Sequence, residues 1–518
     1  MKIKSFIAAC FISLLCFSAG AQNLKLGELF NEGAVLQRNA KVLVWGTTSP
    51  STSVSVNIQG KQVQSKSDET GKWSVELRSL KEGGPFSMSV VSANETIKIK
   101  EIYVGEVWLA GGQSNMAFMI RESLGGKEAA ANATNKNIHY VMVPFKPYDG
   151  AVTKGDMNWR TATAENRVSE MSAVAYYFAK DLQEKLNVPV GVICCYKGGS
   201  GAETWMTREW LMKDTITSPI VANYDDFSLK FGSQLIAKFE VDTKTYEDSI
   251  KAGVRNIVRP QMPMGEHNFN RPAGLYHTML ERCIPYSVKG AIWYQGEYNS
   301  GRAEQYRTLF PALISEWRND FKNPDMPFFF VQLANYGRAD ARNRPIWPEL
   351  REAQLLTWQK IKHTGMAVTM DNGEKENIHP PRKEPVGKRL AYIALNNVYG
   401  FNIPFSGPIY KSVKFNNNQA LLSFDYVYDR LKSEGELMGF TICGEDKKFV
   451  SAKAEIKGNQ IIVSADAVVK PIAVRYGWAN WSEGNLFNSA DLPASPFRTD
   501  NFPMITAGKR CEVYKINK

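Results

Sequence analysis

The sequence predicts a central α/β domain with a mainly parallel sheet, preceded and followed by all-β domains. From residue 105 onwards, short apolar runs alternate with longer stretches of helical pattern, as in parallel strands joined by helical crossovers. Before residue 105 and after residue 400, short alternating runs are separated by Gly, Ser, Asn and Asp, a pattern typical of antiparallel sheets. A length of 518 residues fits about three domains of ordinary size.

The first 21 residues have the pattern of a cleavable secretory signal. Two lysines within the first four residues precede an apolar stretch, and small residues end at Ala21. We therefore expect an exported protein, periplasmic or extracellular, that is cleaved near Ala21. A lipoprotein attached through Cys10 is the alternative, although few apolar residues precede that cysteine. No later stretch approaches the ~20 apolar residues that a membrane span requires.

Two all-β segments flank the centre. Residues 22–104 are expected to form a sandwich-like β-domain, with strands in "KVLVWGT", "SVSVNIQG", "KWSVELRS" and "FSMSVVSA". Residues 401–518 are expected to form a second β-domain, with strands in runs such as "SVKFNNNQALLSFDYV" and "IAVRYGW".

Residues 105–400 carry the α/β pattern. The expected strands are "VWLAGG", "VPVGVICCYKGG", "VKGAIWYQGE", "MPFFFVQLA" and "GMAVTMDNG", and the expected helices include "EMSAVAYYFAKDLQEKL" and "AEQYRTLFPALISEWRNDF". Mixed polar sequence at about 206–263 interrupts this alternation and is expected to be an insertion. Ligands bind at the carboxyl ends of such strands, so we look for functional residues there.

Composition and spacing disfavour several functional classes. The net charge of +11 comes from scattered lysines, which indicates a solvated basic surface rather than a nucleic-acid partner. The five histidines show no zinc-ligand spacing, so no metal is expected. The glycine-rich loop at 198–201 lacks both the P-loop and the dinucleotide pattern, so no nucleotide cofactor is expected. The oligomeric state stays open.

Ser114 and His379 are candidates for nucleophilic catalysis. Each follows an apolar run, Ser114 in "GGQSNM" and His379 in the loop after "MAVTMDNG". A serine hydroxyl is a weak nucleophile and needs a base, for which an imidazole is suited. Candidate donors to an oxyanion are the N–H groups of Ser114 and Gly199 and the side-chain amide of Gln295. Ser114 does not lie in a G-x-S-x-G turn, because residue 116 is Met.

Four blocks of the sequence resemble the sialate O-acetylesterase family of SGNH-type (GDSL-like) carbohydrate esterases: "VWLAGGQSNM", "GGSGAETW", "IWYQGEYN" and "NIHPPRKEPVGKRLA". The resemblance implies a flavodoxin-like, three-layer catalytic domain. It implies Ser114 as nucleophile, His379 as base, and Ser114 N–H, Gly199 N–H and Gln295 as the oxyanion hole. It also implies transfer of acetyl from a sugar hydroxyl to Ser114 followed by hydrolysis, with no cofactor.

The resemblance leaves the substrate open. O-acetylated sialic acids are the first expectation, and acetylxylan or another plant glycan is the alternative. A third hypothesis is a carbohydrate-binding protein that has lost catalysis.

The histidine block departs from the family at the expected acid. Family members commonly have an Asp there, whereas this chain has Glu376-Asn377-Ile378-His379. Asn377 cannot carry the charge that would stabilise an imidazolium. We expect Glu376, three residues before His379, to be the acid. Asp371 is a second candidate, and a backbone carbonyl that leaves a Ser-His dyad is a third.

Trp205 and Asn299 are expected to contact the substrate, and stacking of Trp205 on a sugar ring would be one such contact. Both residues have an alternative interpretation. Aromatic residues near strand ends are more often part of the core, which applies equally to Trp293 and Tyr298. Polar side chains such as Asn299, Glu203 and Glu297 more often serve as buried hydrogen-bonding partners that hold loops rigid.

Overall fold

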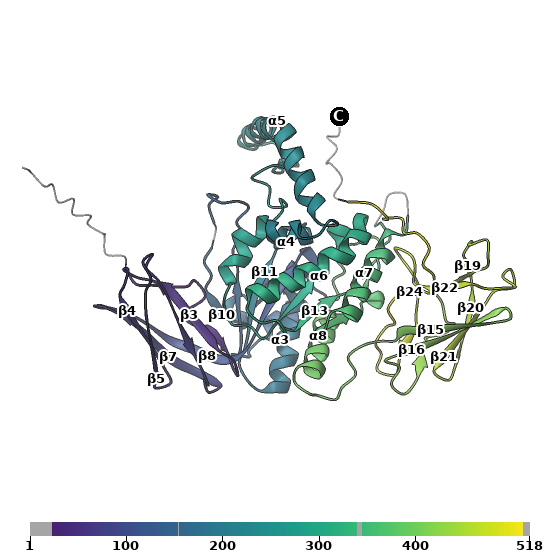
Figure 1. Ribbon diagram of the computed structural model, residues 1–518, viewed down its shortest axis with the longest axis horizontal. Coiled ribbons are helices and arrows are strands. Elements are labelled where there is room, and N and C mark those ends of the chain that lie inside the picture. The colour runs from purple at the N-terminus through teal and green to yellow at the C-terminus, as the bar shows by residue number, and fades with distance from the viewer. Residues whose placement is uncertain (1–22, 154, 339–343, 511–518) are drawn as a thin grey trace, which may run out of the picture.

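The computed structural model describes residues 23–153, 155–338 and 344–510. The expected signal segment, 1–21, lies outside the described residues. Figure 1 shows an elongated molecule with a sheet and its helices in the middle and further sheets at both ends. The predicted mixed α/β architecture with several sheets is confirmed.

The central sheet contains six parallel strands with one antiparallel strand at its edge. The order is β10-β9-β11-β8-β12-β13-β14, and β10 is the antiparallel one. The bounds of these strands are β8 Glu95–Gly112, β9 Ile138–Met142, β10 Trp159–Thr161, β11 Val190–Tyr196, β12 Gly290–Tyr294, β13 Phe328–Val331 and β14 Thr364–Ala367. If β11, β8, β12, β13 and β14 are numbered along the chain, their spatial order is 2-1-3-4-5, which is the flavodoxin-like order.

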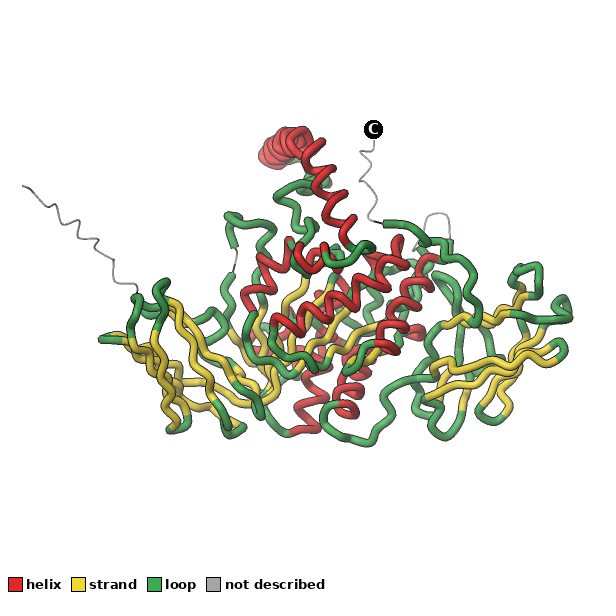
Figure 2. Tube along the Cα trace, in the orientation of Figure 1, coloured by secondary structure: helices red, strands yellow, loops and turns green. Residues whose placement is uncertain are grey.

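Helices cover both faces of this sheet (Figure 2). On one face α3 (Ala173–Leu186) packs against α8 (Glu384–Asn397), and Phe178 of α3 meets Trp108 of β8 with ring centroids 5.1 Å apart. On the other face α6 (Ala303–Asp320) packs against α7 (Ile346–Lys360), and Trp317 of α6 meets Trp293 of β12 at 5.4 Å. Large aromatic side chains therefore fill both interfaces between the sheet and its helices.

Antiparallel strands precede the α/β part. One sheet contains β1 (Lys25–Leu26), β3 (Val42–Thr47) and β6 (Lys72–Leu77), while β4 (Ser53–Ile58), β5 (Lys61–Lys66) and β7 (Gly83–Ser92) join the first half of β8. The short strand β2 (Val35–Gln37) also pairs with β8. The boundary expected at residue 104 falls inside β8, because this 18-residue strand continues from the antiparallel layer into the central sheet.

Strands after α8 form their own sheets around a separate apolar core. One four-stranded sheet has the order β15-β16-β21-β20 and another has the order β19-β18-β22-β24. Their bounds are β15 Ile409–Asn416, β16 Gln419–Asp425, β18 Phe440–Cys443, β19 Val450–Ser451, β20 Lys453–Lys457, β21 Gln460–Ser464, β22 Ala473–Tyr476 and β24 Phe497–Arg498. A two-stranded ladder joins β17 (Leu431–Lys432) to β23 (Phe487–Asn488).

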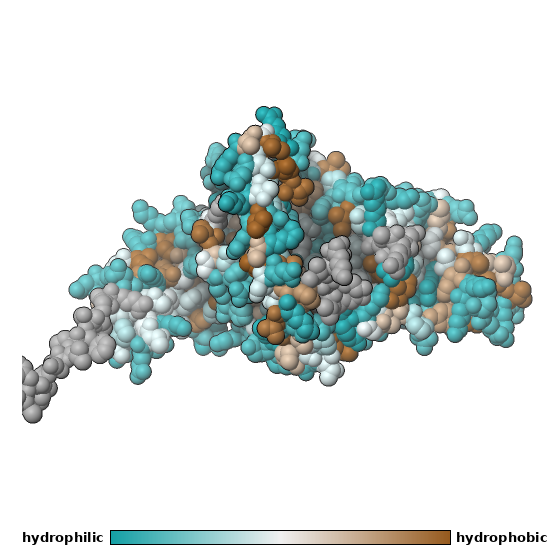
Figure 3. Space-filling view, turned by 90° about the horizontal axis from the view of Figure 1, so that it is seen from above, coloured by the Kyte–Doolittle hydropathy of each residue, from teal (hydrophilic) through white to brown (hydrophobic). Residues whose placement is uncertain are grey.

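A helical projection occupies most of the segment expected to be an insertion. After the short α4 (Arg208–Met212), α5 (Ser218–Lys251) runs for 34 residues away from the sheet (Figure 1). The view down onto this end of the molecule shows apolar patches scattered over a hydrophilic surface (Figure 3). On α5, Leu229 is 87% exposed. Within the described ranges, no helix is both long and apolar enough to cross a membrane.

The register of the central strands brings three loops to the same edge. Gly112 at the end of β8 is paired with Tyr196 at the end of β11 and with Tyr294 at the end of β12. The residues that follow these three positions must therefore emerge side by side. Chain order reverses between β8 and β12, and such a switch point is where open α/β sheets bind ligands.

Candidate active site

Ser114 is presented by a tight turn at the end of β8. Gly112 has φ +133°, and a Cβ atom there would lie 2.2 Å from the carbonyl oxygen of Tyr294, so only glycine fits. The next residue, Gln113, donates its N–H to that same carbonyl at 2.9 Å. Ser114 then begins the single-turn helix α1 (Ser114–Ala117). Close approach of the two strand ends thus fixes where the serine emerges.

His379 meets Ser114 across the edge of the sheet. Its Nε2 atom lies 2.8 Å from Ser114 Oγ. The side chain of Asn377 holds the histidine backbone at both ends: its Oδ1 accepts from His379 N–H at 2.9 Å, and its Nδ2 donates to the His379 carbonyl at 3.0 Å. Two residues that are 265 positions apart in sequence are therefore hydrogen-bonded in the fold.

The structure does not place either expected acid beside His379. Glu376 is exposed and pairs with Arg338 instead. Asp371 receives two hydrogen bonds from the guanidinium of Arg389, at 2.7 and 2.6 Å. No carboxylate within the described ranges forms a hydrogen bond or ion pair with His379. The structure therefore does not support Glu376 as the acid, because its carboxylate pairs with a surface arginine.

The surroundings of His379 favour a neutral imidazole. Burial lowers the pKa of His379 below its ordinary value of 6.5, and the nearby ammonium group of Lys383 lowers it further. The carboxylate of Glu122 opposes this effect in part. Since only the neutral ring can accept the serine proton, this environment keeps His379 in the form that a general base needs.

The glycine-rich loop after β11 lies against Ser114. Lys197 N–H donates to the Gly112 carbonyl at 3.0 Å, and a Cβ atom on Gly198 would lie 3.5 Å from Ser114 Cβ. Gly199 has φ +73°, a conformation that side-chain-bearing residues rarely adopt. The N–H groups of Ser114 and Gly199 donate to no protein acceptor within the described ranges. Two backbone donors are thus available near the serine hydroxyl.

The structure does not offer the Gln295 amide to a substrate. Gln295 is fully buried, and its Nε2 donates to Ser200 O at 3.2 Å and to Asn299 Oδ1 at 2.6 Å. Its Oε1 accepts from the Tyr306 hydroxyl at 3.0 Å. Both amide hydrogens are therefore used within the protein, and the expected oxyanion role of Gln295 is not supported.

Trp205 and Asn299 also belong to the scaffold. Trp205 is fully buried, and its Nε1 donates to Ser200 Oγ at 3.0 Å. Asn299 is buried too: its Oδ1 accepts from Ala202 N–H at 3.0 Å, and its Nδ2 donates to Glu203 Oε2 at 2.9 Å. Both side chains are buried, so the structure does not support the expected substrate contacts. The alternative interpretation, buried partners that hold the loops, is the one observed.

Three residues that the sequence did not single out support the site. Asn270 donates from Nδ2 to the Gly199 carbonyl at 2.9 Å and accepts from Gly201 N–H at 3.2 Å, so it fixes the glycine loop from both sides. Asn115, which is adjacent to Ser114, and Lys383 hydrogen-bond to each other. Asn115 and Lys383 lie in two of the sequence blocks that resemble the family, so those blocks could have identified them. Asn270 follows the insertion and belongs to no recognisable pattern.

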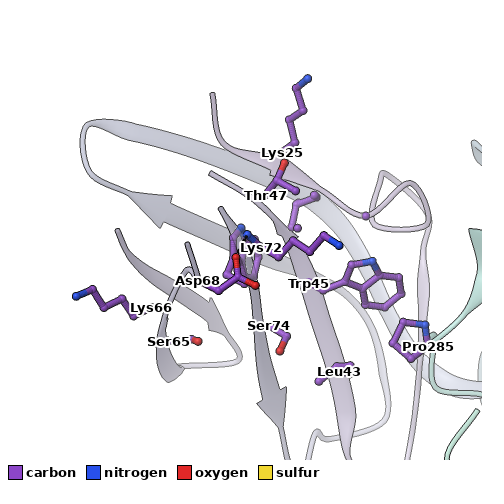
Figure 4. A pocket seen from close by; sticks show the side chains of 14 residues that line it. Lys25, Leu43, Trp45, Thr47, Ser65, Lys66, Asp68, Lys72, Ser74 and Pro285 are labelled. Carbon is purple, nitrogen blue, oxygen red and sulfur yellow. Dashed lines mark hydrogen bonds between the residues drawn. The ribbon is translucent and has the colours of Figure 1, made fainter. Parts of the chain in front are cut away.

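A separate groove of about 630 Å³ lies on the N-terminal sheets. Its walls come from β1, β3, β5 and β6, and include Trp45, Lys66 and Lys72 (Figure 4). The described residues that line it include Asp68 but no histidine. Within the described ranges, no group of three or more His, Cys, Asp or Glu side chains is arranged to hold a metal ion.

Comparisons with known proteins show similarity to carbohydrate esterases. A family model described as carbohydrate esterase, sialic acid-specific acetylesterase, matches residues 263–396. Sialate O-acetylesterase from Mus musculus is 27% identical, with 95% of this chain and 97% of that protein covered. The Homo sapiens protein is 25% identical, with 93% of each chain covered. The crystal structure of a novel carbohydrate acetylesterase from Xanthomonas citri has 34% identity and a TM-score of 0.78, with 93% of this chain and all of that chain covered.

The fold, the serine–histidine contact and these relatives define a carboxylic ester hydrolase. The relatives named acetylesterase and the match along nearly the whole length support deacetylation of carbohydrates as its activity. The chain belongs to the sialate O-acetylesterase family of carbohydrate esterases.

Proposed function

We propose that this protein removes O-acetyl groups from sugars through an acetyl-enzyme formed on Ser114. The observation that carries the proposal is the hydrogen bond of 2.8 Å between Ser114 Oγ and His379 Nε2. The distance is within the range expected of a nucleophile and its general base.

The reaction follows from the positions of these groups. Ser114 Oγ attacks the acetyl carbonyl while His379 Nε2 takes the hydroxyl proton, so a C–O bond forms and the carbonyl π electrons move to oxygen. The N–H groups of Ser114 and Gly199 donate to that oxygen. When the tetrahedral intermediate collapses, the sugar oxygen leaves with the proton from His379. Water, deprotonated by His379, then attacks the acetyl-serine, and acetate leaves as the Ser114 hydroxyl is restored.

A Ser-His dyad supported by the backbone is the proposed form of the machinery. Asn377 holds the His379 backbone where other members of the family commonly have an acidic residue. An amide cannot stabilise an imidazolium as a carboxylate does. Catalysis therefore depends on the orientation of His379 and on the two backbone N–H groups that stabilise the oxyanion.

O-acetylated sialic acids are the proposed first substrates. The curated relatives carry that name, and the family model is described as sialic acid-specific. Lys197, directly before Gly198, supports an anionic sugar: its Nζ lies 4.4 Å from the ring centroid of Phe145 and 5.0 Å from that of Phe269. No carboxylate of the described chain pairs with this cation. The carboxylate of a sialic acid is a chemically suitable partner for it.

An acetylated plant glycan is the second candidate. The Xanthomonas citri relative, with 34% identity, is described only as a carbohydrate acetylesterase. Acetate release from O-acetylated sialic acid and from acetylated xylan, measured side by side, tests the choice. Lys197→Met should lower kcat/KM at least ~10-fold on the sialic acid and leave the neutral glycan within about 2-fold. Preference for xylan, or equal losses on both substrates, would contradict the sialic acid assignment.

Domain organisation and export belong to the same proposal. We infer that the β-rich segments at 22–104 and 401–518 flank an esterase domain, and that β8 is shared between the first segment and that domain. We also infer that the protein is exported after cleavage near Ala21. The carbohydrate-binding hypothesis without catalysis predicts glycan affinity but no acetate release. Release of acetate from 4-nitrophenyl acetate by the wild-type protein, and its loss in a folded Ser114→Ala variant, would exclude that hypothesis. Full activity of Ser114→Ala would overturn the proposed function itself.

A further inference from the structure

Lys383 is a buried cation beneath the catalytic pair. Its side chain is fully buried at the start of α8, four residues after His379. Lysine is almost never fully buried without a partner, because removing an ammonium group from water is costly. The mechanism proposed above does not use this group, so its position calls for a physical reason.

The partner of Lys383 is the residue that follows the nucleophile. Lys383 Nζ donates to Asn115 Oδ1 at 2.5 Å. The other end of that amide, Asn115 Nδ2, donates to Glu297 Oε1 at 2.6 Å and to the Ile378 carbonyl at 3.0 Å. The amide dipole thus lies between a buried cation and a buried carboxylate, and both charges favour the same orientation of the side chain.

This contact joins the two halves of the site. Asn115 is adjacent to Ser114, and Ile378 is adjacent to His379, so a single amide ties the serine turn to the histidine loop. Aromatic rings close the space around the ammonium group, with Nζ 4.7 Å from the ring centroid of Phe118 and 5.5 Å from that of Tyr294. The Phe118 ring also lies against the His379 ring, with centroids 6.5 Å apart.

We propose that Lys383 is a positioning residue for this site: its buried ammonium group aligns the Asn115 amide, and Asn115 holds the Ser114 turn against the His379 loop. The inference rests on the proposed function, since it assigns a role within the same serine–histidine pair. In this proposal a cation and an amide orient the Ser114 turn and the His379 loop. No carboxylate of the described chain contacts the histidine.

The charge of Lys383 has a second effect, on the protonation of His379. The groups that act on the histidine are Lys383, which disfavours the imidazolium, and Glu122, which favours it. Burial lowers the pKa of Lys383 to about 7, against the opposing attraction of Glu297 and Glu374. Below its own pKa, the Lys383 side chain carries the charge that disfavours the His379 imidazolium. A residue that only filled space would not change that titration.

Histidine NMR tests the electrostatic part without requiring turnover. The protein has five histidines, and the loss of one signal in His379→Gln assigns the resonance of interest. We expect Lys383→Met to move the titration midpoint of His379 to higher pH and Lys383→Arg to leave it in place. Glu122→Gln should move it to lower pH, which is the matched control of opposite sign. An unmoved midpoint in Lys383→Met would overturn the electrostatic role.

Kinetics test the positioning part. We expect Lys383→Met and Asn115→Ala each to lower kcat on 4-nitrophenyl acetate at least ~10-fold with little change in KM, because misplaced reacting groups slow the chemical step. The double variant should lose no more than the worse single variant, since both changes break one contact. Independent, multiplying losses would overturn the proposal.

If Lys383→Met leaves Glu297 unpaired and does not fold, the variant that also carries Glu297→Gln removes both buried charges, and the same two predictions apply to it.

Retained activity in Ser114→Ala would contradict the proposed function alone, because the His379 titration is measured independently of catalysis.

Discussion

The carboxylate of Glu376 pairs with the guanidinium of Arg338 at the surface and not with the His379 imidazole. Exposed pairs of this kind contribute little to stability. We therefore expect Glu376→Gln to keep kcat/KM on 4-nitrophenyl acetate within ~3-fold of wild type. The matched control is His379→Gln, which should lose about 10³-fold or more, because it removes the base. A loss in Glu376→Gln of ~100-fold would restore Glu376 as the acid.

The pH dependence of activity should report the lowered pKa of His379. Burial and Lys383 disfavour the imidazolium, so the neutral base persists below the ordinary value of 6.5. Because protonation removes the base, kcat/KM should fall on acidification, with its midpoint below pH 6.5. A profile of kcat/KM between pH 4 and 8 measures this. A midpoint above 6.5 would mean that an unrecognised anion stabilises the imidazolium.

Asn270 should affect the rate without contacting the reacting atoms. Its side chain accepts from Gly201 N–H and donates to the Gly199 carbonyl, so Asn270→Ala frees the loop that carries one proposed oxyanion donor. We expect kcat to fall about 10-fold, less than the 10²–10³ typical of a deleted donor, with KM nearly unchanged. The exposed Asn319→Ala serves as the control. An unchanged kcat in Asn270→Ala would remove Asn270 from the site.

Trp205 should behave as a core residue. The substitution Trp205→Phe removes the hydrogen bond to Ser200 Oγ and leaves a space in a fully buried cluster. We expect the free energy of unfolding, measured in urea, to fall by about 2 kcal/mol. The KM for O-acetylated sugars should change less than about 2-fold in the fraction that stays folded. A large rise in KM with unchanged stability would instead indicate a sugar platform.

Sequence patterns predicted five strands of the central sheet, β8 and β11 to β14, because each is a continuous apolar run and the helices between them have clear periodicity. The edge strands β9 and β10 were not among the expected strands. The same patterns also predicted that Ser114 and His379 would meet, since both follow apolar runs. The sequence pattern did not predict that β8 continues through the expected boundary at residue 104. A long strand shared by two sheets has the same sequence pattern as two short strands.

Side-chain partners were beyond what spacing can predict. Glu376 stands three residues before His379, yet Arg338, from a distant loop, takes its charge. Gln295 follows a strand end as an oxyanion donor should, yet the Ser200 carbonyl and Asn299 occupy its amide. In both cases the deciding partner comes from another segment, and its position is set only by the packed structure.

Covalent labelling tests the central claim most directly. A nucleophile activated by a neighbouring base reacts with an organophosphate, whereas an ordinary surface serine does not. Wild-type protein treated with a fluorophosphonate and mapped by peptide mass spectrometry should carry the label on Ser114, and activity should be lost in proportion. His379→Gln should be labelled far more slowly. A label on a different serine, or an unlabelled Ser114 in an enzyme that releases acetate, would contradict the account.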